Sequence, residues 1–349
     1  MDFLKFLSHV TTVPGLSGFE MPAAEAFKRA FEPYCDEVSV DMMGSVLAVQ
    51  RSNTGKRGPR VMLCAHIDEV GLITTDVEED GSVRFMSRGV AAQTLPAQEV
   101  TLLTKEGPLY GVIGAMPPHL TDASARGEVT PAEKLFIDTG LAPEEVKRRV
   151  PAGTPVQLVG RTMPLLNDLI VSKTMDDRAC AAILLCAAQE LRMRLHDAEI
   201  CYVISAREEI DSYGAMTMAE RIMPDAAIVL DVTHGTMDDC PPGRTFALDV
   251  TDISAGPNTH RKLADYMLKH AKELGIKTER GVAAGTTWTD AWEIQVTCEG
   301  VPCVVVSLPL KYMHTTVETG SAETMRKQAQ LIVSAVSAMH EGWEETLCY

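Results

Sequence analysis

The sequence lacks the features of a membrane or exported protein. It contains no uninterrupted apolar run of about 18 residues, the length needed to span a bilayer, although 46% of its residues are apolar. The first segment, MDFLKFLSHVTTVPG, has neither the basic start, the long apolar stretch nor the small-residue cleavage site of an export signal. We therefore predict a cytoplasmic globular protein with a large core and no membrane partner.

Cysteine motifs and basic clusters are also missing. The 9 cysteines are scattered without a CxxC pair, so reduced and mostly packed thiols are expected rather than a redox or zinc-finger motif. The formal net charge of −16 repels phosphate backbones, and no basic cluster is interleaved with aromatic residues. These features argue against a nucleic-acid partner, while the same acidic charge attracts cations towards carboxylate-lined clefts.

Two kinds of segment alternate along the chain and predict an α/β domain that is interrupted by a β domain. Continuous apolar runs at 61–66 and 302–309 are typical of buried strands, and helical spacing recurs around them. From about residue 70, short alternating runs are punctuated by turn sequences such as EEDG and KEGP. We predict the α/β domain at 1–69 and 164–349 and the inserted domain at 70–163.

Acidic and imidazole residues follow the ends of the predicted strands or open the long central helix. They are His66 and Asp68, Asp176 and Asp177, Glu208 and Glu209, Asp231, and His314. Taken singly, each has an ordinary explanation: a packed histidine, a solvated glutamate pair, or aspartates that cap a helix. Ligands of open α/β sheets bind beyond the carboxyl ends of the strands, so the whole set is predicted to converge.

The chemistry of this set indicates a metal-dependent hydrolase. Imidazole and carboxylate ligands suit Zn, Co or Mn. Two such ions that share a bridging carboxylate lower the pKa of a water between them and polarise a scissile carbonyl. One of Glu208 or Glu209 is well placed to take the proton of the water and return it, while its neighbour binds metal.

Seven segments together resemble the tetrahedral-type (TET) dinuclear metallo-aminopeptidases, which include glutamyl and deblocking aminopeptidases. They follow the family's order over nearly the whole chain. They are VMLCAHIDEVGLI (61–73), GVIGAMPPHL (111–120), SKTMDDRAC (172–180), ISAREEIDSYGA (204–215), VLDVTHG (229–235), TDAWEIQ (289–295) and LKYMHTTVE (310–318). The resemblance implies a zinc-exopeptidase-like fold, in which helices flank a mixed sheet and a small antiparallel β-barrel-like domain is inserted for dimerisation.

The resemblance also implies a metal ligand for each position of the set. His66 and His314 would be terminal ligands of different ions, and Asp176 would bridge the two ions. Glu209 and Asp231 would each complete the shell of one ion. The implied cofactor is therefore two divalent ions per subunit, Zn, Co or Mn.

Three further roles follow from the resemblance. Glu208 would be the general base, and Asp68 would orient the imidazole of His66. Asp177 would follow the bridging aspartate through a cis peptide.

The implied activity is the removal of N-terminal residues from peptides that have a free N-terminus. Relatives form dimers that assemble into hollow tetrahedral dodecamers, so a homo-oligomer is expected.

A non-catalytic metal-binding assembly subunit is the main alternative to an aminopeptidase, and a glycoside hydrolase using Glu208 and Glu209 is another. The preferred N-terminal residue, the native metal and the oligomeric state stay open, as do the roles of four residues. These residues are His119, His234, Trp288 and Trp292.

Overall fold

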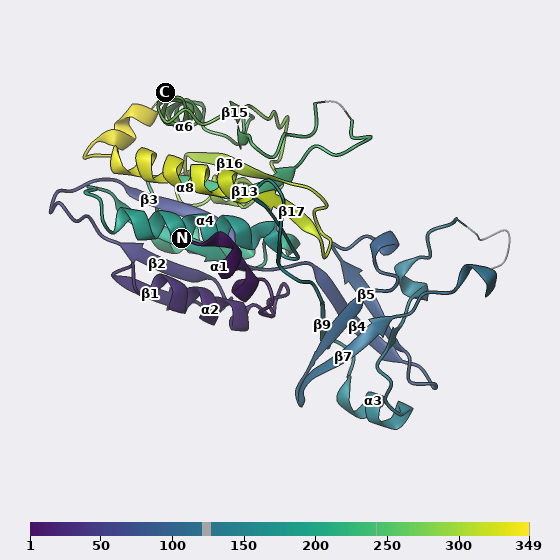
Figure 1. The fold of residues 1–349 in the computed structure, drawn as a ribbon. Helices are drawn as coiled ribbons and strands as arrows, with labels where there is room; N and C mark the ends of the chain where they lie inside the picture. The colour runs from purple at the N-terminus through teal and green to yellow at the C-terminus, as the bar shows by residue number, and fades with distance from the viewer. Residues whose placement is uncertain (121–126, 242, 349) are drawn as a thin grey trace. The chain divides into compact units, whose positions relative to one another are not determined.

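The structure is a computed structural model that describes residues 1–120, 127–241 and 243–348. The chain forms two compact units (Figure 1). The larger unit comprises residues 1–69, 162–313 and 317–349, and the smaller unit comprises residues 70–161 and 314–316.

An eight-stranded mixed sheet forms the centre of the larger unit. Its strands, in spatial order, are β1 (Glu37–Val40), β2 (Val46–Gln50), β12 (Glu199–Ser205), β3 (Arg60–His66), β13 (Ala226–His234), β16 (Cys303–Leu310), β14 (Thr251–Ile253) and β15 (Thr278–Glu279). The four central strands, β12, β3, β13 and β16, are mutually parallel. Nearly all of their residues are buried, as expected for parallel strands covered on both faces.

Helices cover both faces of this sheet. The core on one face is formed with α1 (Phe3–Val10), α2 (Met21–Phe31), α4 (Met175–Leu191), α6 (Arg261–Glu273) and α8 (Ala322–Ser337). The core on the other face is formed with α5 (Tyr213–Ile222) and α7 (Ala291–Ile294). Helix α4 is apolar around most of its circumference and lies beside α8 (Figure 1), which identifies it as the central buried helix.

A small three-stranded sheet and two short 3-10 helices complete the larger unit. The sheet consists of β10 (Met163–Leu165), β11 (Leu169–Ser172) and β17 (Glu318–Ser321), and the 3-10 helices are η5 (Glu208–Ile210) and η6 (Trp343–Leu347). Both η5 and the N-terminal end of β17 carry residues of the candidate site.

The smaller unit is a closed six-stranded barrel whose neighbouring strands are antiparallel. Its strands, in spatial order, are β4 (Gly71–Val77), β5 (Val83–Arg88), β8 (Ile137–Asp138), β7 (Gly107–Ile113), β6 (Glu99–Thr104) and β9 (Pro155–Leu158). It also contains α3 (Pro143–Arg149) and the 3-10 helices η1 (Ala92–Thr94), η2 (Pro118–Leu120) and η4 (Ala132–Lys134). The predicted fold class, a mixed α/β fold with an inserted antiparallel barrel, is confirmed.

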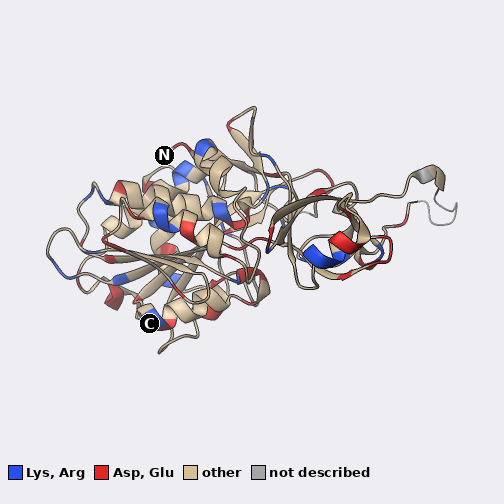
Figure 2. Cartoon of the chain, turned by 90° about the horizontal axis from the view of Figure 1, so that it is seen from below, with Lys and Arg blue, Asp and Glu red and all other residues tan. Residues whose placement is uncertain are grey.

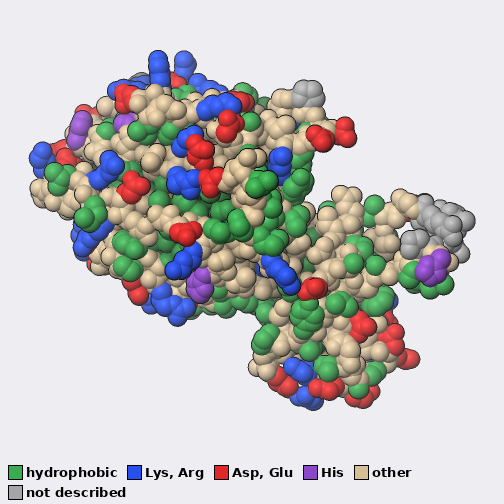
Figure 3. All heavy atoms as spheres, in the orientation of Figure 1, with side chains coloured by type: hydrophobic (Ala, Val, Ile, Leu, Met, Phe, Trp, Pro, Cys, Tyr) green, Lys and Arg blue, Asp and Glu red, His purple; other side chains and the backbone are tan. Residues whose placement is uncertain are grey.

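Charge is distributed in both signs over the described residues. In α3, acidic residues occupy the first turn and basic residues the last turn (Figure 2), which complements the helix dipole. Acidic and basic side chains alternate on the visible face of the larger unit (Figure 3). All 9 cysteines are free, as predicted. No helix in the described part of the chain is both long and apolar enough to cross a membrane.

Candidate metal centre

Register in the central sheet brings the predicted residues to one edge. Strands β3 and β12 are parallel, with Ser205 opposite His66. His66 ends β3, and Glu208 and Glu209 form the start of η5 just beyond β12. Asp231 was expected to close its strand, but β13 continues to His234 because it stays paired with β16 up to that residue.

Three of the predicted ligands form a compact buried cluster. One ligand atom from each of His66, Asp176 and Asp231 lies within 4.8 Å of the other two. The imidazole Nε2 of His66 is 3.0 Å from Oδ1 of Asp176. The three residues are only 2%, 6% and 6% exposed, respectively. One imidazole and two carboxylates form a donor set that suits a divalent transition metal.

The start of α4 presents Asp176 and Asp177 to this cluster. Both residues have non-helical backbone angles, and the peptide between them is cis, as the resemblance implied. Oε2 of the buried Glu318 accepts hydrogen bonds from the backbone N–H groups of Met175 (2.6 Å) and Asp176 (3.1 Å). Asp177 Oδ2 accepts from the backbone N–H of His66 at 3.1 Å, so this aspartate ties α4 to the end of β3.

Asp68 connects the histidine with the two glutamates. Its Oδ1 accepts from the backbone N–H of Glu208 at 3.0 Å and lies 3.4 Å from Nδ1 of His66. Its Oδ2 accepts from the backbone N–H of Glu209 at 3.2 Å and from Oγ of Ser17 at 2.6 Å. Burial opposes ionisation of Asp68, but its hydrogen bond and charge interaction with His66 hold its pKa below the ordinary value.

The electrostatics of the cluster favour a bound cation. Burial raises the pKa of Asp231 well above its ordinary value, and repulsion by Asp177 adds to this effect. Burial likewise raises the pKa of Asp177. Burial disfavours charge on His66 too, yet its hydrogen bonds with Asp176 and Asp68 raise the pKa of the imidazole well above the ordinary value. A cation would compensate these buried carboxylates, so the residues present fit a metal site.

Glu208 lies at the edge of the cluster. Its Oε2 is 3.8 Å from Nε2 of His66, and its side chain is 13% exposed. Burial raises the pKa of Glu208 well above the ordinary value, and the charge of Asp231 adds to the shift while His66 opposes it. A carboxyl group with a raised pKa is a stronger base than an ordinary carboxylate.

The remaining singled-out residues are not members of this buried cluster. His314 is grouped with the smaller unit, where its Nδ1 lies 2.9 Å from the carbonyl oxygen of Gly89. Its role as a metal ligand therefore stays a prediction. His119 and His234 are exposed, and nothing in the structure assigns them a function. Trp288 and Trp292 are 84% and 41% exposed, so neither is a core residue.

Three buried or half-buried residues near the site were not predicted. They are Ser17, Glu318 and Asp290. Glu318 and Asp290 lie in the family-like segments LKYMHTTVE and TDAWEIQ, which is the signal that could have identified them. Ser17 lies outside those segments and reaches Asp68 across 51 positions of sequence.

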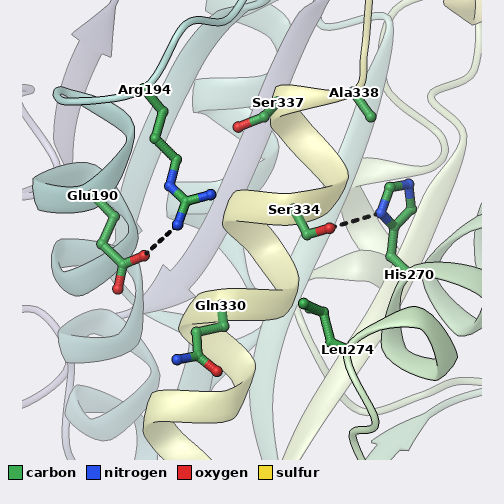
Figure 4. A pocket seen from close by; sticks show the side chains of 8 residues that line it. All are labelled: Glu190, Arg194, His270, Leu274, Gln330, Ser334, Ser337 and Ala338. Atoms are coloured by element: carbon green, nitrogen blue, oxygen red, sulfur yellow. Dashed lines mark hydrogen bonds and ion pairs between the residues drawn. The ribbon is translucent and has the colours of Figure 1, made fainter.

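A cavity of about 490 Å³ lies elsewhere in the larger unit, among residues of α4, α6, α8 and the turns after them (Figure 4). In this cavity, Glu190 pairs with Arg194 at 3.8 Å, and Nδ1 of His270 lies 2.9 Å from Oγ of Ser334. The lining residues include none of the predicted ligands. This cavity is therefore separate from the candidate metal centre.

Comparisons with known proteins show similarity to peptidases in both sequence and fold. Residues 44–331 match the model of the M42 glutamyl aminopeptidase family. A lysyl aminopeptidase of Pyrococcus furiosus is 30% identical over 340 residues, which cover 94% of each chain. A TET aminopeptidase structure from a Thaumarchaeota archaeon has a TM-score of 0.92 at 26% identity and covers 99% of each chain.

A third relative is the TET1 peptidase of Pyrococcus horikoshii, whose structure is described as able to assemble into a tetrahedron or a large octahedral shell. It has a TM-score of 0.83 at 25% identity, and the match covers 97% of this chain and 100% of the other. The family match spans most of this chain, and the relatives in sequence and in fold are also aminopeptidases. The protein therefore belongs to the M42 glutamyl aminopeptidase family of peptide hydrolases.

Proposed function

We propose that this protein is a metal-dependent aminopeptidase that removes N-terminal residues from oligopeptides, with Glu208 as general base. The observation that carries the proposal is the buried cluster of His66, Asp176 and Asp231, which lies beside Glu208 at the edge of the sheet. Membership of the M42 family supports peptide hydrolysis at free N-termini.

Five residues would hold two divalent ions. They are His66, Asp176, Glu209, Asp231 and His314. When bound, the ions polarise the scissile carbonyl and lower the pKa of the attacking water. Zn, Co and Mn all accept this mixture of nitrogen and oxygen ligands. The raised pKa of Asp231 and its burial support the site, because a cation would compensate the charge.

The His314 assignment draws on its chain position and its hydrogen bond. It follows the end of β16 at Leu310 by four residues. If Nδ1 of His314 donates its proton to the Gly89 carbonyl, Nε2 carries the lone pair that a metal needs. An H314A variant should lose affinity for one of the two ions, which equilibrium metal titration measures.

The residues of the chain divide the work of the reaction. Glu208 takes a proton from the attacking water on its carboxylate and returns that proton to the departing amine. Asp68 holds the backbone N–H groups of Glu208 and Glu209, so the base keeps its place during the transfer. Asp68 also orients the ring of His66.

Assembly into a homo-oligomer forms part of the proposal. The P. horikoshii TET1 peptidase, described as forming a tetrahedron or an octahedral shell, is similar over nearly the whole chain. We assign dimerisation to the inserted barrel and expect dimers to build a tetrahedral dodecamer. Analytical ultracentrifugation of the metal-loaded protein tests this, and a purely monomeric species contradicts it.

A panel of aminoacyl chromogenic substrates and N-terminally blocked controls tests the activity. Cleavage confined to free N-termini supports the proposal and reveals the preferred residue. An inert protein with full metal content would instead indicate the non-catalytic assembly subunit. Cleavage of oligosaccharides by exhaustively chelated protein would indicate the glycoside hydrolase.

A further inference from the structure

Asp290 is a buried carboxylate beside the candidate site that the proposed reaction does not use. The residue is 1% exposed and directly precedes α7. Its Oδ2 accepts a hydrogen bond from Oγ of Ser205 at 2.5 Å and lies 3.3 Å from Sγ of Cys64. Burial and the charge of Asp290 raise the pKa of the Cys64 thiol well above the ordinary value, so Cys64 keeps its proton and donates.

Two of the partners of Asp290 belong to the strands that carry the site. Cys64 lies on β3, two residues before His66, and Ser205 ends β12, three residues before Glu208. Oγ of Ser205 also lies 3.2 Å from the carbonyl oxygen of Ala65. One carboxylate oxygen therefore fixes the ends of both neighbouring strands.

The segment between Ser205 and Glu208 is short and held on several sides. The backbone N–H of Ala206 donates to Oγ of Ser45 at 3.0 Å, and its carbonyl accepts from the backbone N–H of Gly214 at 2.9 Å. A Cβ on Gly214 would come within 2.3 Å of that carbonyl oxygen, so α5 packs too closely against this segment for any side chain at position 214. A displacement at Ser205 would therefore be transmitted to Glu208 rather than absorbed by a flexible loop.

We propose that Asp290 is a positioning residue for the general base. By holding the Ser205 hydroxyl, it fixes the end of β12 and thereby the point from which the Glu208 side chain extends. Asp290 itself touches neither the substrate nor the reacting atoms. This inference rests on the proposed function, because it gives Asp290 a role in the same reaction.

Removal of the carboxylate should lower turnover without weakening substrate binding. Asp290→Ala should reduce kcat about 10- to 100-fold, the range for outer-sphere residues that orient a site. KM should change less than about two-fold, because ground-state contacts with the substrate are untouched. Asp290→Asn keeps a carbonyl oxygen that can accept from Ser205, so it should restore most of kcat.

Ser205→Ala separates the hydrogen bond from other consequences of losing Asp290. If Asp290 acts on Glu208 through the Ser205 hydroxyl, Ser205→Ala lowers kcat. The double variant Ser205→Ala and Asp290→Ala is then no slower than Asp290→Ala alone. Ser205→Ala removes a single oxygen and should disturb folding less than Asp290→Ala does. It can therefore test the inference if Asp290→Ala does not fold. Unchanged kcat in Ser205→Ala overturns the inference.

Asp252 provides a matched control within the same sheet. It is 3% exposed and accepts from Oγ of Ser254 at 3.0 Å and from the backbone N–H of Gly281 at 2.6 Å. It lies on β14, outside the candidate site. Asp252→Ala should lower thermal stability without changing kcat. An equal loss of kcat in both alanine variants overturns the positioning role.

Hydrogen exchange supplies a readout that does not need turnover. Amides of the segment 203–212 should exchange faster in Asp290→Ala than in the parent protein, and Asp252→Ala should leave this segment unchanged. If the parent protein cleaves no peptide, the proposed function fails, yet the exchange result still decides whether Asp290 orders this segment. Unchanged protection of 203–212 in Asp290→Ala overturns the inference.

Discussion

Two buried charged clusters, built from neighbouring positions of the chain, differ in their charge balance. In the first, Glu69 pairs with the Lys173 ammonium, accepts from Oγ1 of Thr174 at 2.8 Å and lies 3.5 Å from the Arg178 guanidinium. Burial opposes ionisation of Glu69, but Lys173 and Arg178 hold its pKa below the ordinary value. This cluster contains its own counter-charges.

The second cluster, the candidate metal centre, lacks enough counter-charges for its carboxylates. Asp176, Asp177 and Asp231 face a single imidazole, and burial raises the pKa of both Asp177 and Asp231 well above the ordinary value. The comparison separates two uses of buried charge. A carboxylate with cations beside it holds elements together, whereas an excess of buried carboxylates marks a place that a cation must complete.

The largest effect is expected at the general base. Glu208→Gln should lower kcat by about 10²- to 10⁴-fold, because the amide cannot accept the proton of the attacking water. Bound metal, measured by elemental analysis, should be unchanged. The exposed Glu345→Gln variant is the matched control and should keep full activity. A Glu208→Gln protein with parent-like kcat would show that the base is another residue.

Breaking the Glu69 cluster should produce the largest loss of stability. Glu69→Gln leaves Lys173 and Arg178 buried without their counter-charge, so we expect the free energy of unfolding to fall by about 3–5 kcal/mol. Chemical denaturation measures the change. The double variant Glu69→Met and Lys173→Met removes both charges of the pair and should recover part of the loss. Equal stability of Glu69→Gln and the parent protein would contradict the assignment.

Glu20 is a third kind of buried carboxylate, because its hydrogen-bond donor is a neutral backbone group. It accepts from the backbone N–H of Gly18. Burial raises its pKa from 4.5 to about 7. Between these values the folded chain retains a proton that the unfolded chain has released, so stability falls as pH rises through this window. Glu20→Gln should match the parent protein below about pH 4 and be up to about 3 kcal/mol more stable above pH 7. Parallel slopes of stability against pH for the two proteins would refute this.

The smallest effect has the opposite sign to that of Glu69→Gln. In metal-free protein, Asp231→Asn removes one repelling charge while its amide oxygen can still accept from the backbone N–H of Val232. We expect a gain of about 1 kcal/mol in the free energy of unfolding at pH 8. Added metal should stabilise the parent protein more than this variant. A loss of stability in metal-free Asp231→Asn would remove the contrast between the clusters.

Most of the fold and the residue types of the site could be predicted because they depend on local pattern. Continuous apolar runs predicted the parallel strands, and the strand ends placed His66, Asp231 and the two glutamates at one edge. Frequent turns and alternating runs predicted the barrel. The family-like segments then implied the cis peptide between Asp176 and Asp177, which the structure contains.

The supporting contacts could not be predicted because they join distant positions. Glu69 meets Lys173 across 104 positions, and Ser205 meets Asp290 across 85. No periodicity or spacing reports such pairs; only the folded sheet brings them together. The end of β13 was misplaced for a related reason, since pairing with β16 carries the strand past Asp231 to His234.

The central claim is that the unbalanced carboxylate cluster holds metal ions that peptide cleavage requires. The most direct test is to titrate exhaustively chelated protein with Zn, Co or Mn while following hydrolysis of an aminoacyl chromogenic substrate. The account predicts no cleavage before metal is added and a rise that saturates at two ions per chain. Full activity in the chelated protein, or none at saturating metal, would contradict it.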